Sequence, residues 1–373
     1  MFFLYPYISI EHIIDIYNDT IIKYDLISNK CNIDSFIPAE YDGDNIGRRY
    51  GCVSYYDGKL LLAPLAEHKI LVYYLENKSF SSIDFDISNY GNNYTINGFQ
   101  NIITNGKYMY LIPGLYDCIL KVDMESEKVF RIEGNYTETG KRHAGLQTAN
   151  SGYVLVDNMA YISYWDNNTI LKLDLNSDSI KEIKLDLSMP RVLRDIVYDG
   201  ECFWVTDRDD NCLIKWDEKK GNVEEIDIDL EVYDRTGFMY LFSNGKSLYI
   251  CPKYGKSIIK YDKQLRTIDK LIDIPYDPIE SVKLLPWSGT SFFSKMELCK
   301  DIYLYSAPTA FLCKYDFSED DIVLCSSMNV DADDTKRVWE KWKRRFWLTL
   351  DNKLLHEVEG FNISDYIKNV SKV

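Results

Sequence analysis

Hydrophobic and polar positions alternate over short segments of about five residues, and such segments recur along the whole chain. The most regular unit contains four of them, separated by polar residues: 194–198, 201–206, 212–216 and 222–226. A period of two is typical of strands, and short polar separations are typical of antiparallel hairpins. The pattern therefore predicts four antiparallel strands in each unit.

A five-residue motif marks the repeat. It consists of two apolar residues, a lysine, an apolar or aromatic residue, and an aspartate. Its copies are residues 21–25, 119–123, 170–174, 213–217, 258–262 and 312–316, with a degenerate copy at 71–75. With the lysine, or Tyr73, as the marker, the intervals are 50, 48, 51, 43, 45 and 54 residues. This spacing is the period of a β-propeller blade.

A second marker precedes the motif at a nearly constant distance. Two-residue turns rich in Asp, Asn and Gly occur at 57–58, 105–106, 157–158, 199–200 and 244–245, and each lies 14 or 15 residues before the motif marker. Such pairs favour tight type I′ hairpins. Together the markers predict an all-β β-propeller of seven four-stranded blades. We expect the motif lysine to be a plain solvated strand residue and the motif aspartate to form the next turn.

Residues 200–225, GECFWVTDRDDNCLIKWDEKKGNVEE, resemble the repeats of the NHL, YVTN and streptogramin-lyase-like propeller families. The likeness lies in a glycine, an apolar-Trp-apolar step, Thr-Asp, and then a basic-apolar-Asp step. The resemblance implies a propeller fold. It does not imply one activity, because these folds host lyases, binding modules and scaffolds alike.

The two ends of the chain suggest how the ring closes. Residues 346–358 repeat the pattern of a first strand, an Asp-Asn turn and a second strand, whereas the N-terminal unit begins without a clear first strand. We expect the C-terminal strand to pair within the first blade, making residues 1–373 one domain. A partial eighth blade is the less favoured alternative. A short helix is predicted over 334–345, packed on the ring or, alternatively, binding a partner.

Composition narrows the classes of partner and compartment. The formal net charge of −15 disfavours general nucleic-acid binding. The sequence contains no run of 18 apolar residues, so no membrane span is expected. The nine cysteines form no CxxC pair, and several lie in predicted strands, namely Cys202, Cys212, Cys251 and Cys313. We therefore expect free, buried thiols in a reducing compartment, the cytoplasm.

Arginines gather in the connections that precede the first strand of a blade. Eight of the twelve lie there: Arg48, Arg49, Arg142, Arg191, Arg194, Arg235, Arg344 and Arg345. In a propeller these connections surround the mouth of the channel, and a guanidinium fork binds carboxylate, phosphate or sulfate. The sequence thus predicts an anion site, with the last two arginines as weaker members because they can belong to the helix. The alternative is that each arginine pairs with loop acids such as Asp42, Asp44, Asp195 or Asp234 and merely ties blades together.

Three functions follow from this site. The leading hypothesis is a non-catalytic binding propeller for an anionic small molecule, an acidic glycan or a protein segment. The second is a lyase or hydrolase with His143 as general base, a role that the resemblance to streptogramin-like lyases implies. The third is a protein scaffold. Metal-ligand spacings and phosphate loops are absent from the sequence, so no metal or cofactor is expected, and residues 207–211 are expected to be a solvated turn rather than a calcium loop.

Overall fold

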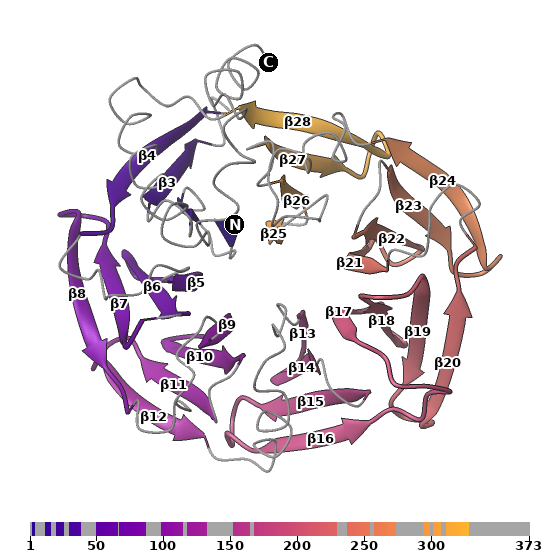
Figure 1. The fold of residues 1–373 in the computed structure, drawn as a ribbon, viewed down its shortest axis with the longest axis horizontal. Coiled ribbons are helices and arrows are strands. Elements are labelled where there is room, and N and C mark those ends of the chain that lie inside the picture. The colour runs from indigo at the N-terminus through magenta and orange to yellow at the C-terminus, as the bar shows by residue number, and fades with distance from the viewer. Residues whose placement is uncertain are drawn as a thin grey trace, which may run out of the picture. The chain divides into compact units, whose positions relative to one another are not determined.

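The computed structural model describes residues 2–3, 12–15, 20–25, 30–38, 50–65, 67–86, 98–114, 118–132, 152–164, 168–229, 237–253, 257–273, 294–298, 301–306 and 311–327. Their strands form seven antiparallel sheets of four strands, and the chain passes through each sheet from the first strand to the fourth (Figure 1). This confirms the all-β fold and the four-stranded unit. The number of blades, the helix at 334–345 and the closing strand within 346–358 stay predictions, because residues 328–373 lie outside the described ranges.

The chain divides into two compact units. The first contains the sheets β1–β4 and β5–β8 and most of β25–β28. Its first strand is Phe2–Phe3, which pairs with Ile14 and Asp15. The strands of this unit are β1 (Phe2–Phe3), β2 (His12–Asp15), β3 (Thr20–Asp25), β4 (Lys30–Phe36), β5 (Tyr50–Tyr56), β6 (Lys59–Pro64), β7 (Lys69–Tyr74), β8 (Ser79–Asp84), β25 (Ser294–Leu298), β26 (Asp301–Ser306), β27 (Phe311–Asp316) and β28 (Asp321–Ser327). The single domain expected over 1–373 stays a prediction.

The second unit contains four sheets and the turn that joins β27 to β28. The first strands β13, β17 and β21 are neighbours, and the fourth strands β16, β20 and β24 lie at the opposite side of their sheets (Figure 1). The strands are β9 (Phe99–Asn105), β10 (Tyr108–Pro113), β11 (Ile119–Asp123), β12 (Lys128–Ile132), β13 (Tyr153–Val156), β14 (Met159–Tyr164), β15 (Thr169–Asp174), β16 (Ile180–Lys184), β17 (Leu193–Tyr198), β18 (Phe203–Asp207), β19 (Cys212–Asp217), β20 (Asn222–Asp227), β21 (Phe238–Ser243), β22 (Ser247–Pro252), β23 (Ser257–Asp262) and β24 (Thr267–Asp273).

The core of the second unit lies between successive sheets. Phe203 and Val205 of β18 pack into a cluster with residues of β14 and β15, whereas Trp204 packs into a cluster with residues of β21 to β23. Successive side chains of a strand point to opposite faces. Both faces of a middle strand are therefore buried, and burial of a large apolar side chain contributes about 1.5–3 kcal/mol. Six cysteines are buried and free, as expected: Cys52, Cys118, Cys202, Cys212, Cys251 and Cys313.

The predicted hairpin turns have several forms. Asp57 and Gly58 both have positive φ, as a type I′ turn requires. In the turns after β17 and β21, Gly200 and Gly245 have positive φ, but Asp199 and Asn244 do not. There the side chain of the first residue instead accepts hydrogen bonds from two backbone N–H groups further along the turn. The type I′ prediction is wrong for these two turns, because side-chain capping permits a longer loop. It is also wrong for 105–106 and 157–158, where Asn105 and Asn158 do not have positive φ.

The motif aspartate forms the turn between the third and fourth strands, as predicted. Asp123, Asp174, Asp217 and Asp262 each accept hydrogen bonds from the backbone N–H groups two and three residues later. The fifth residue of the turn has a left-handed backbone, as at Asp178 and Asp320. These contacts are local, so each repeat can form its own turn.

The motif lysine has a different role from the one expected. Lys121 and Tyr110 both bond to the carboxylate of Asp178, which belongs to the next sheet, with Nζ and Oη at 2.7 and 2.9 Å. The same contact joins Lys172 and Tyr161 to Glu218, and Lys260 and Tyr249 to Asp320. We call this set of three residues the inter-sheet clamp. The prediction of a plain solvated lysine is wrong for these three copies, whose side chains are only 14–25% exposed.

Candidate functional site

Two of the predicted arginines lie among the described residues, Arg191 and Arg194. Arg48, Arg49, Arg142, Arg235, Arg344, Arg345 and the candidate base His143 lie outside the described ranges. Both described arginines lie at the end of the sheets where the fourth strand connects to the next first strand and the second strand connects to the third. We call this the connection end, and the opposite end the turn end.

Arg191, in the segment before β17, is surrounded by carboxylates. Its Nη1 lies 3.0 Å from Asp207 and 3.3 Å from Asp210, and its Nε and Nη2 both lie 2.7 Å from Glu225. Its backbone N–H donates to Asn168 of the preceding sheet at 2.7 Å. The side chain is 6% exposed. The guanidinium of Arg191 is therefore paired with acids of its own sheet, and only its backbone N–H bonds to the preceding sheet. Pairing with loop acids is the alternative that the sequence raised, although the acids differ and the ion pairs do not tie two sheets together.

These ion pairs set the charge states around Arg191. Burial opposes its charge, but the bonds to Asp207 and Glu225 outweigh that effect and raise its pKa. Burial raises the pKa of Asp207 despite the bonds from Asp209 and Arg191. For Glu225, burial is outweighed by the bonds from Ser188 and Arg191, so its pKa is lowered. The positive charge of Arg191 is thus fully engaged by carboxylates.

Arg194 lies at an irregularity in β17, where the register with β18 shifts between Leu193 and Ile196. Its backbone is tied to the preceding sheet, because its carbonyl oxygen accepts bonds from the Gly152 N–H at 2.7 Å and the Ser163 hydroxyl at 2.9 Å. A bulge of this kind re-aims a side chain. The backbone of Arg194 is thus held in one position by two sheets.

The guanidinium of Arg194 extends toward the following sheet. It lies 5.4 Å from the ring centre of Tyr240 in β21, and its Nη2 donates to the Tyr240 hydroxyl at 3.4 Å. The residue is 3% exposed, and its Nε and Nη1 have no hydrogen-bond partner. Burial raises the pKa of Tyr240 to about 12, so its phenol is neutral at physiological pH. Arg194 is a buried cation with unused donors.

Asp195 is the neighbour that makes this arrangement possible. It is 2% exposed, and its carboxylate accepts the backbone N–H groups of Ile196 at 3.0 Å and Leu241 at 2.8 Å. A Cβ on Gly152 would lie 2.0 Å from Asp195 Oδ1, so only glycine fits there. Sequence reasoning missed Gly152, Ser163 and Tyr240, because nothing local connects them to Arg194.

The acidic loop 207–211 is a turn whose carboxylates bind neighbouring cations. Asp207 and Asp210 bind Arg191, and Asp209 binds Lys253 at 3.0 Å. Within the ranges that the structure describes, no group of three His, Cys, Asp or Glu residues is arranged to hold a metal ion. The same ranges contain no helix of the length and hydropathy needed to span a bilayer.

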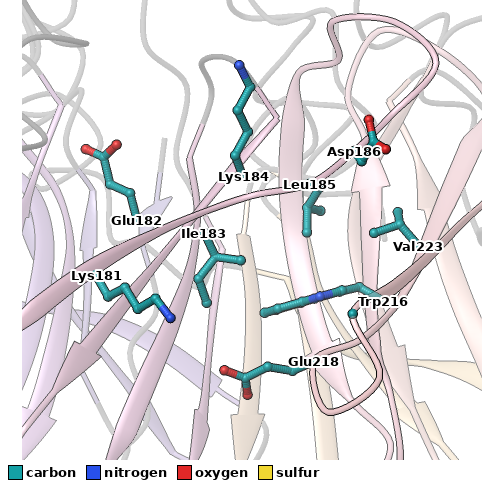
Figure 2. Close-up of a pocket in the computed structure, with 10 residues that line it drawn as sticks. Lys181, Glu182, Ile183, Lys184, Leu185, Asp186, Trp216, Glu218 and Val223 are labelled. Carbon is teal, nitrogen blue, oxygen red and sulfur yellow. The ribbon is translucent and has the colours of Figure 1, made fainter.

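A groove of about 460 Å³ lies away from the arginines, along β16 and the turn from β19 to β20 (Figure 2). Trp216, Ile183 and Val223 form its apolar part, and Lys184 and Glu182 extend from its edge (Figure 2). Trp216 is 3% exposed and Glu218 already binds Tyr161 and Lys172. The groove lies between two clamped sheets, and its charged lining residues Lys181, Glu182, Lys184 and Asp186 are exposed.

Comparison with known proteins identifies the fold. No family model matches the sequence, and no curated protein matches it significantly. Virginiamycin B lyase from Staphylococcus aureus is similar in structure, with a TM-score of 0.52, 12% identity, and coverage of 74% of this chain and 83% of that one. A streptogramin B lyase has a TM-score of 0.50 and 13% identity, with coverage of 74% of this chain and 81% of that one. KlHsv2 with loop 6CD replaced by a Gly-Ser linker has a TM-score of 0.52 and 8% identity, with coverage of 87% of this chain and 96% of that one.

At such low identity the likeness concerns the fold alone. It confirms the fold-level resemblance to streptogramin-lyase-like propellers that residues 200–225 suggested. The chain therefore has the β-propeller fold that its repeat predicts.

Proposed function

We propose that this chain is a non-catalytic binding β-propeller that takes up an anionic group at Arg194. One observation carries the proposal: the guanidinium is buried, yet its Nε and Nη1 have no partner. The partners proposed are an anionic small molecule, an acidic glycan or a protein segment. The free, buried cysteines support the further proposal of a reducing, cytoplasmic compartment.

The energetic argument compares Arg194 with Arg191. A buried charge without a partner is costly, and ordinary packing pairs it or removes it. Arg191, three residues away, is paired with three carboxylates. The folded chain thus supplies partners for the guanidinium of Arg191 but leaves two donor groups of Arg194 without a partner. A bound anion would supply what Arg194 lacks, and charge-assisted bonds to an arginine are among the strongest in proteins.

The backbone geometry supports a binding role over a chance arrangement. The carbonyl of Arg194 is held by Gly152 and Ser163, and its guanidinium lies against the Tyr240 ring. Preorganised groups bind with a smaller entropic cost. Because Arg194 is 3% exposed, a ligand reaches it only after a local opening, so slow association is expected.

Thermal unfolding with a panel of anions tests this proposal. The full chain is unfolded in matched ionic strength with carboxylates, phosphates, sulfates and sugar acids, as wild type and as Arg194→Gln. An anion at a hundredfold its Kd should stabilise the wild type by about 2.7 kcal/mol and leave the variant unchanged. Arg266→Gln is the control, because Arg266 is 57% exposed and pairs only with Glu224 among the contacts that the structure gives. Stabilisation that persists in Arg194→Gln, or none at all, would overturn the proposal.

A further inference from the structure

One motif lysine of the second unit, Lys215 of β19, lacks an inter-sheet clamp. Its register is that of the three clamp lysines, but its cross-strand neighbour is Trp204, where the clamps have a tyrosine. Its Nζ lies 5.3 Å from the ring centre of Trp204. Among the described residues, Lys215 forms no ion pair. It is a half-buried clamp lysine without the carboxylate that the other three bind.

The reason lies in the turn between β23 and β24 of the following sheet. A clamp acid occupies the first residue after the motif aspartate, as Glu218 does, or the fourth, as Asp178 and Asp320 do. In this turn the same two positions hold Lys263 and Arg266. Arg266 has the left-handed backbone that the two aspartates also have. Both acid positions are therefore occupied by cations.

Two acids that the sheet of Lys215 directs at the following sheet are already engaged. Asp199 accepts a bond from Lys263 Nζ at 2.6 Å and another from an indole N–H. Glu224, which is opposite Lys215 in the β19–β20 pairing, bonds through both carboxylate oxygens to Arg266. These ion pairs join the two sheets with the charges reversed. Lys215 takes no part in them.

A buried hydroxyl at the same junction also lacks a partner. Tyr261 of β23 belongs to the apolar cluster that contains Trp204, and it is 2% exposed. Its Oη has no hydrogen-bond partner. Burial raises the pKa of this hydroxyl, and Arg266 and Glu224 act on it electrostatically. Buried polar groups are normally bonded, so the polar contacts at this junction are incomplete in both sheets.

The turns around Lys215 are basic, whereas corresponding turns elsewhere are acidic. Residues 218–221 are Glu-Lys-Lys-Gly and 263–266 are Lys-Gln-Leu-Arg, but 124–127 are Met-Glu-Ser-Glu and 317–320 are Phe-Ser-Glu-Asp. Lys219, and Lys246 in the turn before β22, are exposed and form no ion pair with the rest of the described chain. Leu265 adds an apolar side chain that is 74% exposed. In a chain of net charge −15, such a surface complements an acidic partner.

We infer that the turn end of the sheets β17–β20 and β21–β24 docks an acidic protein segment, one carboxylate of which completes the clamp at Lys215. In the three clamps the lysine binds a carboxylate that a backbone turn holds in place. A free anion meets only a single half-buried lysine, and such contacts are weak in water. A segment presents several carboxylates at once, and each contact raises the effective concentration of the next. This surface is separate from Arg194 and goes beyond the binding role proposed there.

Fluorescence anisotropy of a dye-labelled peptide of ten glutamates, titrated with the full chain at pH 7, tests the inference. Lys215→Met should weaken binding by about fivefold or more, because it removes the cation that the docked carboxylate needs. Lys121→Met is the matched control: it removes a motif lysine that already binds Asp178, and it should change the Kd by less than about twofold.

A second variant supplies the missing acid from the chain itself. Arg266→Asp places a carboxylate at the clamp position, and aspartate tolerates the left-handed backbone there, as Asp178 does. The new acid should bind Lys215 and weaken binding of the peptide by about tenfold or more. Lys128→Glu makes the same change in net charge at an exposed position of β12, so its smaller effect measures general repulsion.

Four results contradict the inference. The glutamate peptide does not bind at low ionic strength; its binding is equal in wild type, Lys215→Met and Arg266→Asp; its binding is lost in Arg194→Gln alone; or a labelled oligothymidylate of ten nucleotides binds more tightly and with the same dependence on Lys215. The last result would identify a nucleic acid as the occupant. Because Arg194→Gln should leave the peptide's Kd unchanged, failure here and failure of the Arg194 site are distinguishable.

Discussion

The two ends of the sheets in the second unit differ in how completely their charged side chains are paired. At the turn end, three of the four motif lysines form an inter-sheet clamp, in which a lysine and a tyrosine of one sheet share a carboxylate of the next, as with Lys121, Tyr110 and Asp178. At the connection end, Arg191 is equally well paired, but Arg194 is buried with donors unused. Charges that hold the fold together are compensated. The exception therefore marks where function can lie.

The packing of the connection end should have the largest effect on stability. Gly237 has φ of +74°, and a Cβ there would lie 1.8 Å from the backbone oxygen of Arg208. Gly245, at the turn end of the same sheet, has φ of +85° with nothing within 4 Å. Gly237→Ala should lower the free energy of unfolding by about 4 kcal/mol or more, and Gly245→Ala by about 1 kcal/mol. Urea unfolding measures both, and equal losses would show that the connection end is loosely packed.

The contrast between the two arginines comes next. Arg191→Met removes the cation that three carboxylates share and should cost about 3–5 kcal/mol, because loss of the partner of a buried charge is strongly destabilising. Arg266→Met removes an exposed pair with Glu224 and should cost at most about 1 kcal/mol. The measurement is again the free energy of unfolding in urea. A loss below 1 kcal/mol in Arg191→Met would remove the distinction between structural and functional arginines.

The clamps should contribute a smaller amount each. Asp178→Asn keeps a residue type that tolerates the left-handed backbone but removes the charge that binds Lys121. It should cost about 1 kcal/mol. A double-mutant cycle with Lys121→Met should show a coupling energy of about 0.5 kcal/mol or more. Zero coupling would mean that the clamp is a contact without energetic weight.

The turn aspartates should make stability depend on pH. Bonds from the backbone of Asn176 and from Ser177 hold the pKa of Asp174 below its usual value. A depressed folded pKa stabilises the fold above the unfolded value of about 4, and that stabilisation is lost as pH falls through the folded pKa. The gap in Tm between wild type and Asp174→Asn should be constant above about pH 5 and shrink toward pH 3. A gap that widens in acid would contradict the assignment.

Arg194 should show the smallest effect on stability. Arg194→Met replaces an incompletely bonded buried cation with an apolar chain of similar length, so the free energy of unfolding should change by less than about 1 kcal/mol, or rise. The anion-dependent shift in Tm should nevertheless disappear. A large loss of stability without ligand would place Arg194 with Arg191 as a structural residue.

The presence and period of the repeat follow from the sequence alone. Alternation with a period of two, the Asp that caps its own turn and the constant spacing of the markers are interactions between residues a few positions apart. They predict four-stranded units and the β-propeller fold, which the structural comparisons confirm. The tight turn after β5 followed from the same local rule, whereas the turns after β17 and β21 departed from it because a side chain supplied the cap.

Whether each charged side chain is paired or left without a partner depends on the tertiary structure alone. Arg191 and Arg194 lie three residues apart in one segment, yet their partners come from different elements. The carboxylates around Arg191 come from β18, β20 and the loop after β18, and the ring beside Arg194 comes from β21. The clamp joins residues as far apart as Tyr110 and Asp178. Alternation shows which face a residue occupies but not what faces it from another strand. Pairing and burial of a charge depend on that facing residue, so only the folded chain distinguishes Arg191, which is paired, from Arg194, which keeps two donor groups without a partner.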